Sequence, residues 1–154
     1  MKHQSQASKE ILIKAVLQSI PTYSMGVFKL PKAIDEELNK LTRQYWWVQQ
    51  ENKGRINWCP WNQMKSSKII GGLGSRDLEF FNMAMLAKQG WRLVQNSGSL
   101  AAKIISTKYY PNGNFLQATI KRIASYIWRS IHYAEALLET GLMWHIGNGR
   151  RTRI

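Results

Sequence analysis

The chain has 154 residues, 44% of them hydrophobic, which is enough for one hydrophobic core and predicts a single domain over residues 1–154. Its 22 Lys and Arg against 9 Asp and Glu give a formal net charge of +13, which favours RNA or DNA as a partner. The single cysteine, Cys59, excludes an internal disulfide, and we expect a buried, unreactive thiol. No apolar run is long enough to span a membrane, and the N-terminus lacks the apolar segment of a secretory signal.

Periodic apolar residues predict a first helix that begins at Ser8, its N-cap, and ends before Pro21. Residues 22–30 are apolar but short, so we expect a second short helix or a bend. Pro31 suits the first turn of the next helix. The side chains expected to face inward on the first and third segments are Leu12, Ile13, Val16, Leu17 and Ile20, then Ile34, Leu38, Leu41 and Tyr45.

The longest periodic segment, residues 78–95, follows a short helical turn that begins at Pro60 and a glycine hinge at residues 71–74. Gly90 in its interior costs roughly 1 kcal/mol relative to alanine, so we expect another helix to approach closely there. The expected buried stripe is Phe80, Ala84, Ala87, Trp91 and Val94, flanked by Leu78, Phe81, Met85 and Leu86, and the expected exposed residues are Asn82, Lys88, Gln89, Arg92 and Gln95.

The C-terminal third predicts a helix over residues 100–109, a loop over 111–124 with an apolar patch at Phe115 and Leu116, and a last helix capped by Ser125. The last helix should bury Ile127, Ile131, Ala134 and Leu138 and end at Gly141. Residues 142–154 have the pattern of a β-hairpin. The sequence therefore predicts a mainly α fold, a helical bundle with a short C-terminal β-hairpin.

The sequence offers few candidates for catalytic residues. Metal-assisted nucleotidyl transfer needs several converging carboxylates, whereas Asp35 and Asp77 are the only aspartates and lie far apart in the sequence. His132 and Glu135 could meet one turn apart, but a locally hydrogen-bonded histidine is the favoured interpretation. We therefore predict no catalytic residue, no metal, no cofactor, no small-molecule substrate and no enzymatic activity.

The glycine hinge and the aromatic residues each leave two interpretations open. The hinge lacks the pattern of a phosphate-binding loop, so it is either a plain turn with positive φ or a contact for a nucleic-acid phosphate. Tryptophans such as Trp58 and Trp61 could stack on bases, although core packing is favoured. Trp46 and Trp47 are the exception, because neighbours on a helix cannot both point inward.

Basic residues gather around the hinge and the two helices that follow it. They form either a surface that tracks phosphates or a dispersed, solvated surface. The candidates for nucleic-acid binding are Lys65, Lys68, Arg76, Lys88, Arg92, Lys103 and Lys108.

Eight short motifs occur in a characteristic order: SIPTYSM, VFKLP, QYWW, INWCPW, GGLGSRDLEFFNMAMLAKQGWRL, TKYYPNGNF, SYIWRSI and GLMWHIGNG. In sequence and order, from about Ser8 onward, they resemble the segment that follows the reverse transcriptase palm in plant LINE-type (non-LTR) retrotransposon polyproteins. The chain also resembles open reading frame products of the plant mitochondrial genome that derive from such elements.

The resemblance implies a piece of a polymerase, the thumb and connector between the palm and the downstream ribonuclease H region. The family's catalytic aspartates lie upstream and match no position here, and the signals expected past the hairpin are missing, which implies truncation at the C-terminus. The implied function is a non-catalytic remnant with residual affinity for RNA or DNA, in the mitochondrion. The alternative is a degenerate protein with no present biochemical activity, or one that folds only with a partner.

Overall fold

The computed structural model describes residues 5–47, 59–111 and 113–143. Within these ranges the secondary structure is entirely helical, as the mainly α prediction requires. The predicted β-hairpin falls on residues 142–154, and all of it beyond Met143 lies outside the described residues. No helix in the described ranges is long and apolar enough to cross a membrane.

The helices follow the predicted order along the chain. In sequence they are α1 (Gln6–Leu12), its π-helical continuation η1 (Ile13–Leu17), α2 (Thr22–Met25), α3 (Lys32–Trp47), α4 (Trp61–Lys65), the 3-10 turn η2 (Lys68–Ile70), α5 (Leu78–Gln95), α6 (Leu100–Tyr109), the 3-10 turn η3 (Phe115–Gln117), α7 (Tyr126–Tyr133) and α8 (Glu135–Gly141).

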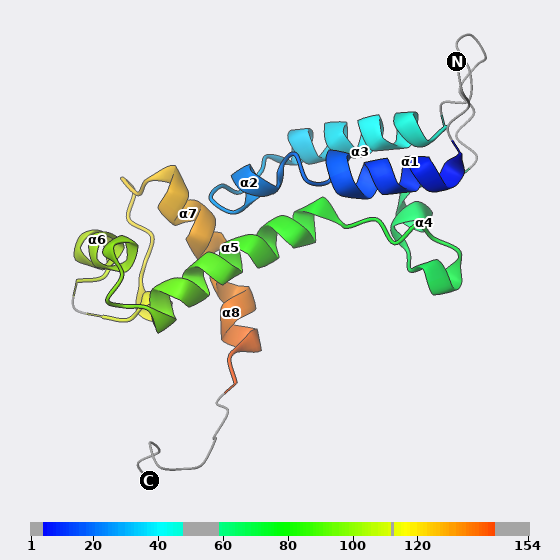
Figure 1. The fold of residues 1–154 in the computed structure, drawn as a ribbon. Helices are drawn as coiled ribbons and strands as arrows, with labels where there is room; N and C mark the ends of the chain where they lie inside the picture. Colours follow the sequence, from blue (N-terminus) through cyan, green and yellow to red (C-terminus); the bar gives the residue numbers. More distant parts are fainter. Residues whose placement is uncertain (1–4, 48–58, 112, 144–154) are drawn as a thin grey trace.

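The long helix α5 is the axis of the fold (Figure 1). It contacts α2 and α3 near its N-terminal half, and η3, α7 and α8 further along. Helices α1 and α3 pack side by side above it in Figure 1, and α7 and α8 cross it near its C-terminal end. The result is an elongated molecule in which α5 joins an N-terminal pair of helices to a C-terminal cluster.

Local capping chemistry explains where most helices begin. The Asp77 carboxylate accepts hydrogen bonds from the first backbone amides of α5, and Ser99 and Ser125 do the same for α6 and α7. The first helix was predicted to start at Ser8, but the structure shows Ser5 as its N-cap, with the Ser8 amide donating to the Ser5 hydroxyl. The prediction was wrong by about one turn, because both serines precede the same apolar pattern.

The buried face of α5 differs from the predicted stripe. The buried residues recur at steps of three and four, as a helix requires, but Phe80, Ala84, Trp91 and Val94 are exposed. Asn82, which the sequence placed on the exposed side, is only 5% exposed. The side chains of α5 that are buried are Leu78, Asn82, Leu86, Ala87 and Leu93, together with Gly90.

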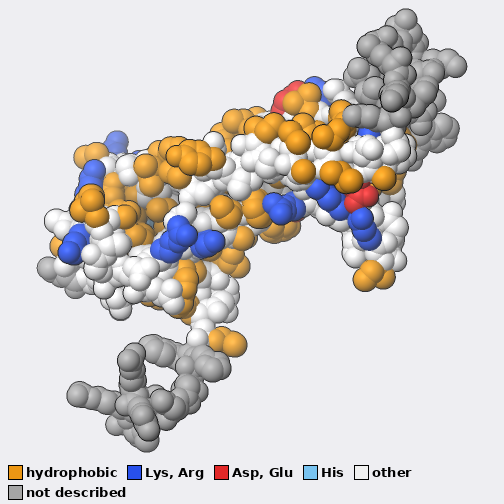
Figure 2. All heavy atoms as spheres, in the orientation of Figure 1, with side chains coloured by type: hydrophobic (Ala, Val, Ile, Leu, Met, Phe, Trp, Pro, Cys, Tyr) orange, Lys and Arg blue, Asp and Glu red, His pale blue; other side chains and the backbone are white. Residues whose placement is uncertain are grey.

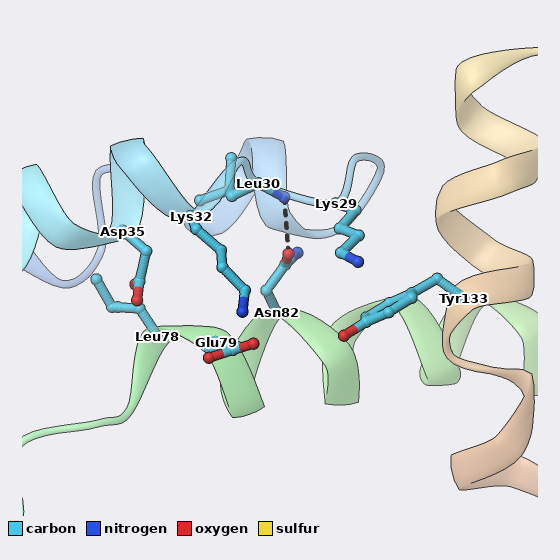
Figure 3. A pocket seen from close by; sticks show the side chains of 8 residues that line it. All are labelled: Lys29, Leu30, Lys32, Asp35, Leu78, Glu79, Asn82 and Tyr133. Atoms are coloured by element: carbon cyan, nitrogen blue, oxygen red, sulfur yellow. Dashed lines mark hydrogen bonds between the residues drawn. The ribbon is translucent and has the colours of Figure 1, made fainter.

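Asn82 holds the α2–α3 connection onto α5. Its Nδ2 donates to the carbonyl oxygens of Met25 and Phe28, each at 2.9 Å. Its Oδ1 accepts from the Leu30 amide at 2.9 Å, the hydrogen bond drawn in Figure 3. These backbone groups lie at the end of α2 or just past it, where no helical partner is available to them. The side-chain amide therefore supplies both the donors and the acceptor that this bend needs.

Gly90 permits the close approach that its position in α5 predicted. A Cβ atom there would lie 2.7 Å from Leu138 Cδ1 and 3.0 Å from Phe115 Cζ. Leu138 belongs to α8 and Phe115 to η3, so one glycine admits two elements of the C-terminal cluster. The expectation of a close approach by another helix is confirmed.

The C-terminal cluster combines stacked rings with most of the predicted aliphatic stripe, because Ile131 and Ala134 are buried and Leu138 packs against the core. The rings of Tyr109 and Trp128 stack with their centroids 4.7 Å apart, and Phe115 meets Trp128 edge to face at 5.7 Å. The Tyr109 hydroxyl also donates to the Ser125 hydroxyl at 2.8 Å, which links the end of α6 to the start of α7. Ile127 was predicted to face inward but is exposed, and the last helix is interrupted at Ala134.

The two N-terminal helices bury their predicted apolar faces only in part. Polar positions share the interior with the apolar stripes of α1 and α3. Lys9 and Thr42 are among the buried residues. Of the residues expected to face inward, Ile13 is buried, Leu12, Leu17, Leu38 and Tyr45 are half-buried, and Val16, Ile20, Ile34 and Leu41 are exposed.

We predict that Asn82→Leu lowers the free energy of unfolding by about 3 kcal/mol or more. The substitution keeps the volume but leaves two carbonyl oxygens and one amide without their partner, and each buried unpaired group costs about 1–3 kcal/mol. Urea denaturation followed by circular dichroism measures the change. The matched control is Asn62→Leu on α4, an exposed position where we expect a change within about 0.5 kcal/mol. Equal stability of the two variants would contradict a stabilising role for the hydrogen bonds of Asn82.

A pair of substitutions at Gly90 tests the close approach. In Gly90→Ala, the gain in helix propensity of about 1 kcal/mol opposes the displacement of Leu138 and Phe115, and we expect a net change below about 1 kcal/mol. Gly90→Val adds branched bulk against both side chains and should destabilise the protein by about 2 kcal/mol. Thermal unfolding distinguishes them. At Gly98, where a Cβ meets nothing within 4 Å, the step from Ala to Val should matter far less.

Candidate nucleic-acid interface

The glycine hinge is a compact turn whose amides are already used. Gly71 and Gly74 have φ values of 85° and 61°, the left-handed region that favours glycine. The amides of Gly71, Gly72, Leu73 and Gly74 all donate to backbone carbonyl oxygens of residues 64–68. A Cβ on Gly72 would lie 2.0 Å from the Ser66 carbonyl oxygen. The hinge therefore matches the plain turn, and these amides are not free to hold a phosphate.

The N-terminus of α5 is likewise occupied by the chain's own carboxylate. Asp77 Oδ1 accepts from the Glu79 and Phe80 amides at 3.1 and 3.5 Å, and Oδ2 accepts from Lys65 Nζ at 2.8 Å. Burial raises the pKa of Asp77, but the hydrogen bond and charge of Lys65 and the two amides outweigh it, so the pKa lies below its usual range. Lys65 therefore pairs with the carboxylate that caps α5, and this ion pair neutralises its charge.

A second ion-pair cluster ties the hinge to the first helix. Glu10 Oε1 lies 2.8 Å from Lys14 Nζ and 2.6 Å from Lys68 Nζ. The hydrogen bonds from Lys14 and Lys68 lower the pKa of Glu10 to about 2. Lys68, although largely exposed, thus shares a carboxylate that comes from a distant part of the sequence.

The remaining candidate cations make no ion pair with the described residues. The Arg76 guanidinium lies over the Phe81 ring at 4.8 Å, and Lys108 Nζ lies 5.4 Å from the centre of the Tyr109 ring. Lys88 and Arg92 are exposed and one turn apart on α5.

The seven candidates therefore form three groups instead of one. Lys65, Lys68 and Arg76 lie at the hinge, Lys88 and Arg92 lie on α5, and the last two lie on α6. Figure 2 shows basic side chains in separate groups with hydrophobic side chains between them. The groups at the hinge and on α5 differ in one respect, because Lys65 and Lys68 form ion pairs with described carboxylates and the α5 pair does not.

The predicted encounter of His132 and Glu135 is present. His132 Nε2 lies 3.0 Å from Glu135 Oε2 and 2.7 Å from the Ala118 carbonyl oxygen. Burial raises the pKa of Glu135, although the charge of His132 opposes the rise. The contact joins the loop before α7 to the start of α8, which is the locally hydrogen-bonded role expected of this histidine.

A small cavity lies where α3 and α5 begin (Figure 3). Its volume is about 30 Å³, enough to hold water. Burial raises the pKa of Asp35 on its wall; the charge of Lys65 opposes the rise, and the charges of Asp77 and Glu79 add to it. The two aspartates that are distant in sequence are thus close enough to interact, although in the described ranges no three His, Cys, Asp or Glu side chains are arranged to hold a metal ion.

The tryptophans and the cysteine divide between core and surface. Trp61 is buried and donates from Nε1 to Asn39 Oδ1 at 2.9 Å. Trp46 and Trp47 are both half-buried and line an open hollow beside the hinge, whereas Trp58 lies outside the described residues. Cys59 was expected to be buried but is half-buried, with its Sγ donating to Gln63 Oε1 at 3.1 Å.

Fold and site together define a basic, mainly helical protein whose seven candidate cations lie in three groups. No protein-family model and no solved structure matches the chain. It is 36% identical over 137 residues to "Uncharacterized mitochondrial protein AtMg00310" of Arabidopsis thaliana, a match that covers 88% of this chain and 89% of that protein. The chain belongs to the same family as that protein.

A second relative is much longer. The protein named "Putative ribonuclease H protein At1g65750", also from Arabidopsis thaliana, is 32% identical over 161 residues. The match covers 97% of this chain but only 24% of that protein. The chain thus spans about a quarter of this relative's length.

The ion pairs of Glu10 predict a specific response to acid. A carboxyl group with a lowered pKa contributes stability above the pKa of the unfolded chain, near 4.5, and loses it as the pH falls toward about 2. The difference in unfolding free energy between the wild type and Glu10→Gln should therefore shrink between pH 5 and about 2. Denaturant titrations at several pH values measure it. Glu36→Gln, which removes an exposed carboxylate outside any described ion pair, should show a nearly constant difference.

Proposed function

We propose that the chain is a non-catalytic remnant of a non-LTR retrotransposon reverse transcriptase, from its thumb and connector region, that binds RNA or DNA through its basic helices. The observation that carries this proposal is the match of 97% of the chain to a quarter of a protein named for a ribonuclease. The order of eight sequence motifs supports the same origin. A thumb grips nucleic acid by its phosphates, a task that needs charge and shape but no acid or base.

The charge of the chain is the second observation that supports binding to nucleic acid. The net charge of +13 on 154 residues creates a field that attracts polyanions. Lys65 and Lys68 are paired with described carboxylates, so among the seven candidates the cations without such a pair are Arg76 and those of α5 and α6. We propose these as the phosphate contacts.

A degenerate protein without activity, or one that folds only with a partner, is the competing proposal. The exposed apolar side chains of α1 and α3, among them Ile11, Ile34 and Leu41, support it. Measurement of nucleic-acid binding by the purified, folded chain decides between the two.

We predict salt-dependent binding to a labelled 20-nucleotide oligonucleotide. If the chain contacts several phosphates, the logarithm of the association constant should fall linearly with the logarithm of salt concentration, by about 0.7 per phosphate for a single strand. Fluorescence anisotropy between 25 and about 300 mM NaCl measures the slope. Absence of binding at the lowest salt would refute the nucleic-acid proposal.

The same preparation tests the non-catalytic part. With Mg²⁺ or Mn²⁺ and primed template or RNA–DNA hybrid, we expect neither nucleotide incorporation nor cleavage. Metal-dependent turnover that persists through purification would overturn this part and leave the binding proposal intact.

We also propose that the protein acts in mitochondria. The support is a relative named as a mitochondrial protein, which matches 88% of this chain. Peptide mass spectrometry of purified mitochondria tests the location, and recovery of the protein only from other fractions would refute it.

A further inference from the structure

The outer face of α5 carries aromatic side chains that the described residues leave partly exposed. Phe80 is 66% exposed and Trp91 is 36% exposed, although their spacing predicted burial. The elements that contact α5 pack against its opposite side, through the face that contains Asn82 and Gly90. Two aromatic side chains are therefore presented to solvent from the most central helix of the fold.

Cations share this face with the aromatic residues. A helix turns 100° per residue, which places residues 80, 84, 88, 91, 92 and 95 on one continuous arc. In that arc Lys88 and Arg92 supply two positive charges, and no position carries a carboxylate. Arg92 donates to the Gln89 side chain at 3.4 Å, and neither cation forms an ion pair with a described residue. The face thus offers positive charge that no described carboxylate neutralises.

The length of the face suits a short segment of single-stranded nucleic acid. At 1.5 Å of rise per residue, Phe80 and Trp91 are separated by about 16 Å along the helix, with Lys88 between them and Arg92 just beyond Trp91. Aromatic rings that alternate with cations are the combination that binds single strands, because each base has a face to stack and each nucleotide a phosphate. A duplex offers phosphates, but its bases are stacked on one another and unavailable to these rings.

We propose that the outer face of α5 is a docking surface for single-stranded RNA or DNA, with Phe80 and Trp91 stacking on bases and Lys88 and Arg92 contacting phosphates. This inference rests on the proposed nucleic-acid binding and adds its location and the form of its ligand. A nucleic acid is favoured over a protein partner because the face combines free cations with a net charge of +13.

The test compares ring removal with charge removal. The double variant Phe80→Leu and Trp91→Leu keeps apolar bulk but removes both rings. Its affinity for a labelled single-stranded oligo(dT) 20-mer should fall about 10-fold or more, since stacking contributes about 1–3 kcal/mol per base. The double variant Lys88→Gln and Arg92→Gln should weaken binding and reduce the salt slope by about 1.4, the value for two phosphates on a single strand.

Matched controls keep the result specific. Tyr23→Leu removes a ring that is exposed on α2, and the pair Lys121→Gln and Arg122→Gln removes two exposed cations outside α5. We expect both controls to bind the 20-mer nearly as the wild type does. Phe80→Tyr with Trp91→Tyr, which restores the rings, should recover most of the affinity. Circular dichroism verifies that each variant is folded.

The outcomes separate the two proposals. If the wild type binds but the ring variant binds equally well, or if a duplex of the same length binds as tightly as the single strand, the α5 surface is refuted and nucleic-acid binding stands. If the wild type does not bind at low salt, both the nucleic-acid binding and the α5 surface are refuted. A change of the ring variant in oligomeric state by light scattering, without a change in affinity, would assign the face to contacts between copies and also refute it.

Discussion

The side-chain amide of Asn82 is the contact on which the arrangement of the N-terminal half depends. The bend between α2 and α3 carries two carbonyl groups and one amide without helical partners, and a single side chain pairs with all of them. Buried backbone groups without partners are costly, so this bend can lie against α5 only where such a side chain is offered. The hydrogen bonds of Asn82 thereby position α3, and through α3 also α1.

Once Asn82 faces inward, helix geometry decides the rest of α5. Residues one turn apart share a face, so Leu78, Leu86 and Gly90 follow Asn82 into the interior and Phe80 and Trp91 are turned outward. The sequence pattern predicted Leu78, Leu86 and Ala87 correctly as buried, but it also placed Phe80 and Trp91 inward, because it counts apolar residues and assigns an asparagine to solvent. The partners of Asn82 lie more than fifty residues away, and no local pattern reveals them.

Features determined by neighbouring residues were predictable, and features determined by distant contacts were not. The position of α5, the cap at Ser125 and the short turn after Pro60 follow from local chemistry and are present. The close approach at Gly90 is a distant contact, but it was predictable because a glycine inside a helix marks it locally. The faces of α1 and α3 were predicted only in part, because polar positions share the interior with their apolar stripes. Likewise, the spacing of Lys68 gave no sign of its partner Glu10.

The same distant contacts decide which cations remain open to a ligand. The chain has 9 carboxylates and 22 basic side chains, so most cations cannot be neutralised internally. The location of the few ion pairs therefore determines where unpaired positive charge lies on the surface. The fold directs Asp77 and Glu10 to Lys65 and Lys68, and it leaves Lys88 and Arg92 beside rings that Asn82 has turned outward. One buried amide thus links the packing of the helices to the composition of the surface. A change that reverses the face of α5 would remove both its interior and its candidate binding surface.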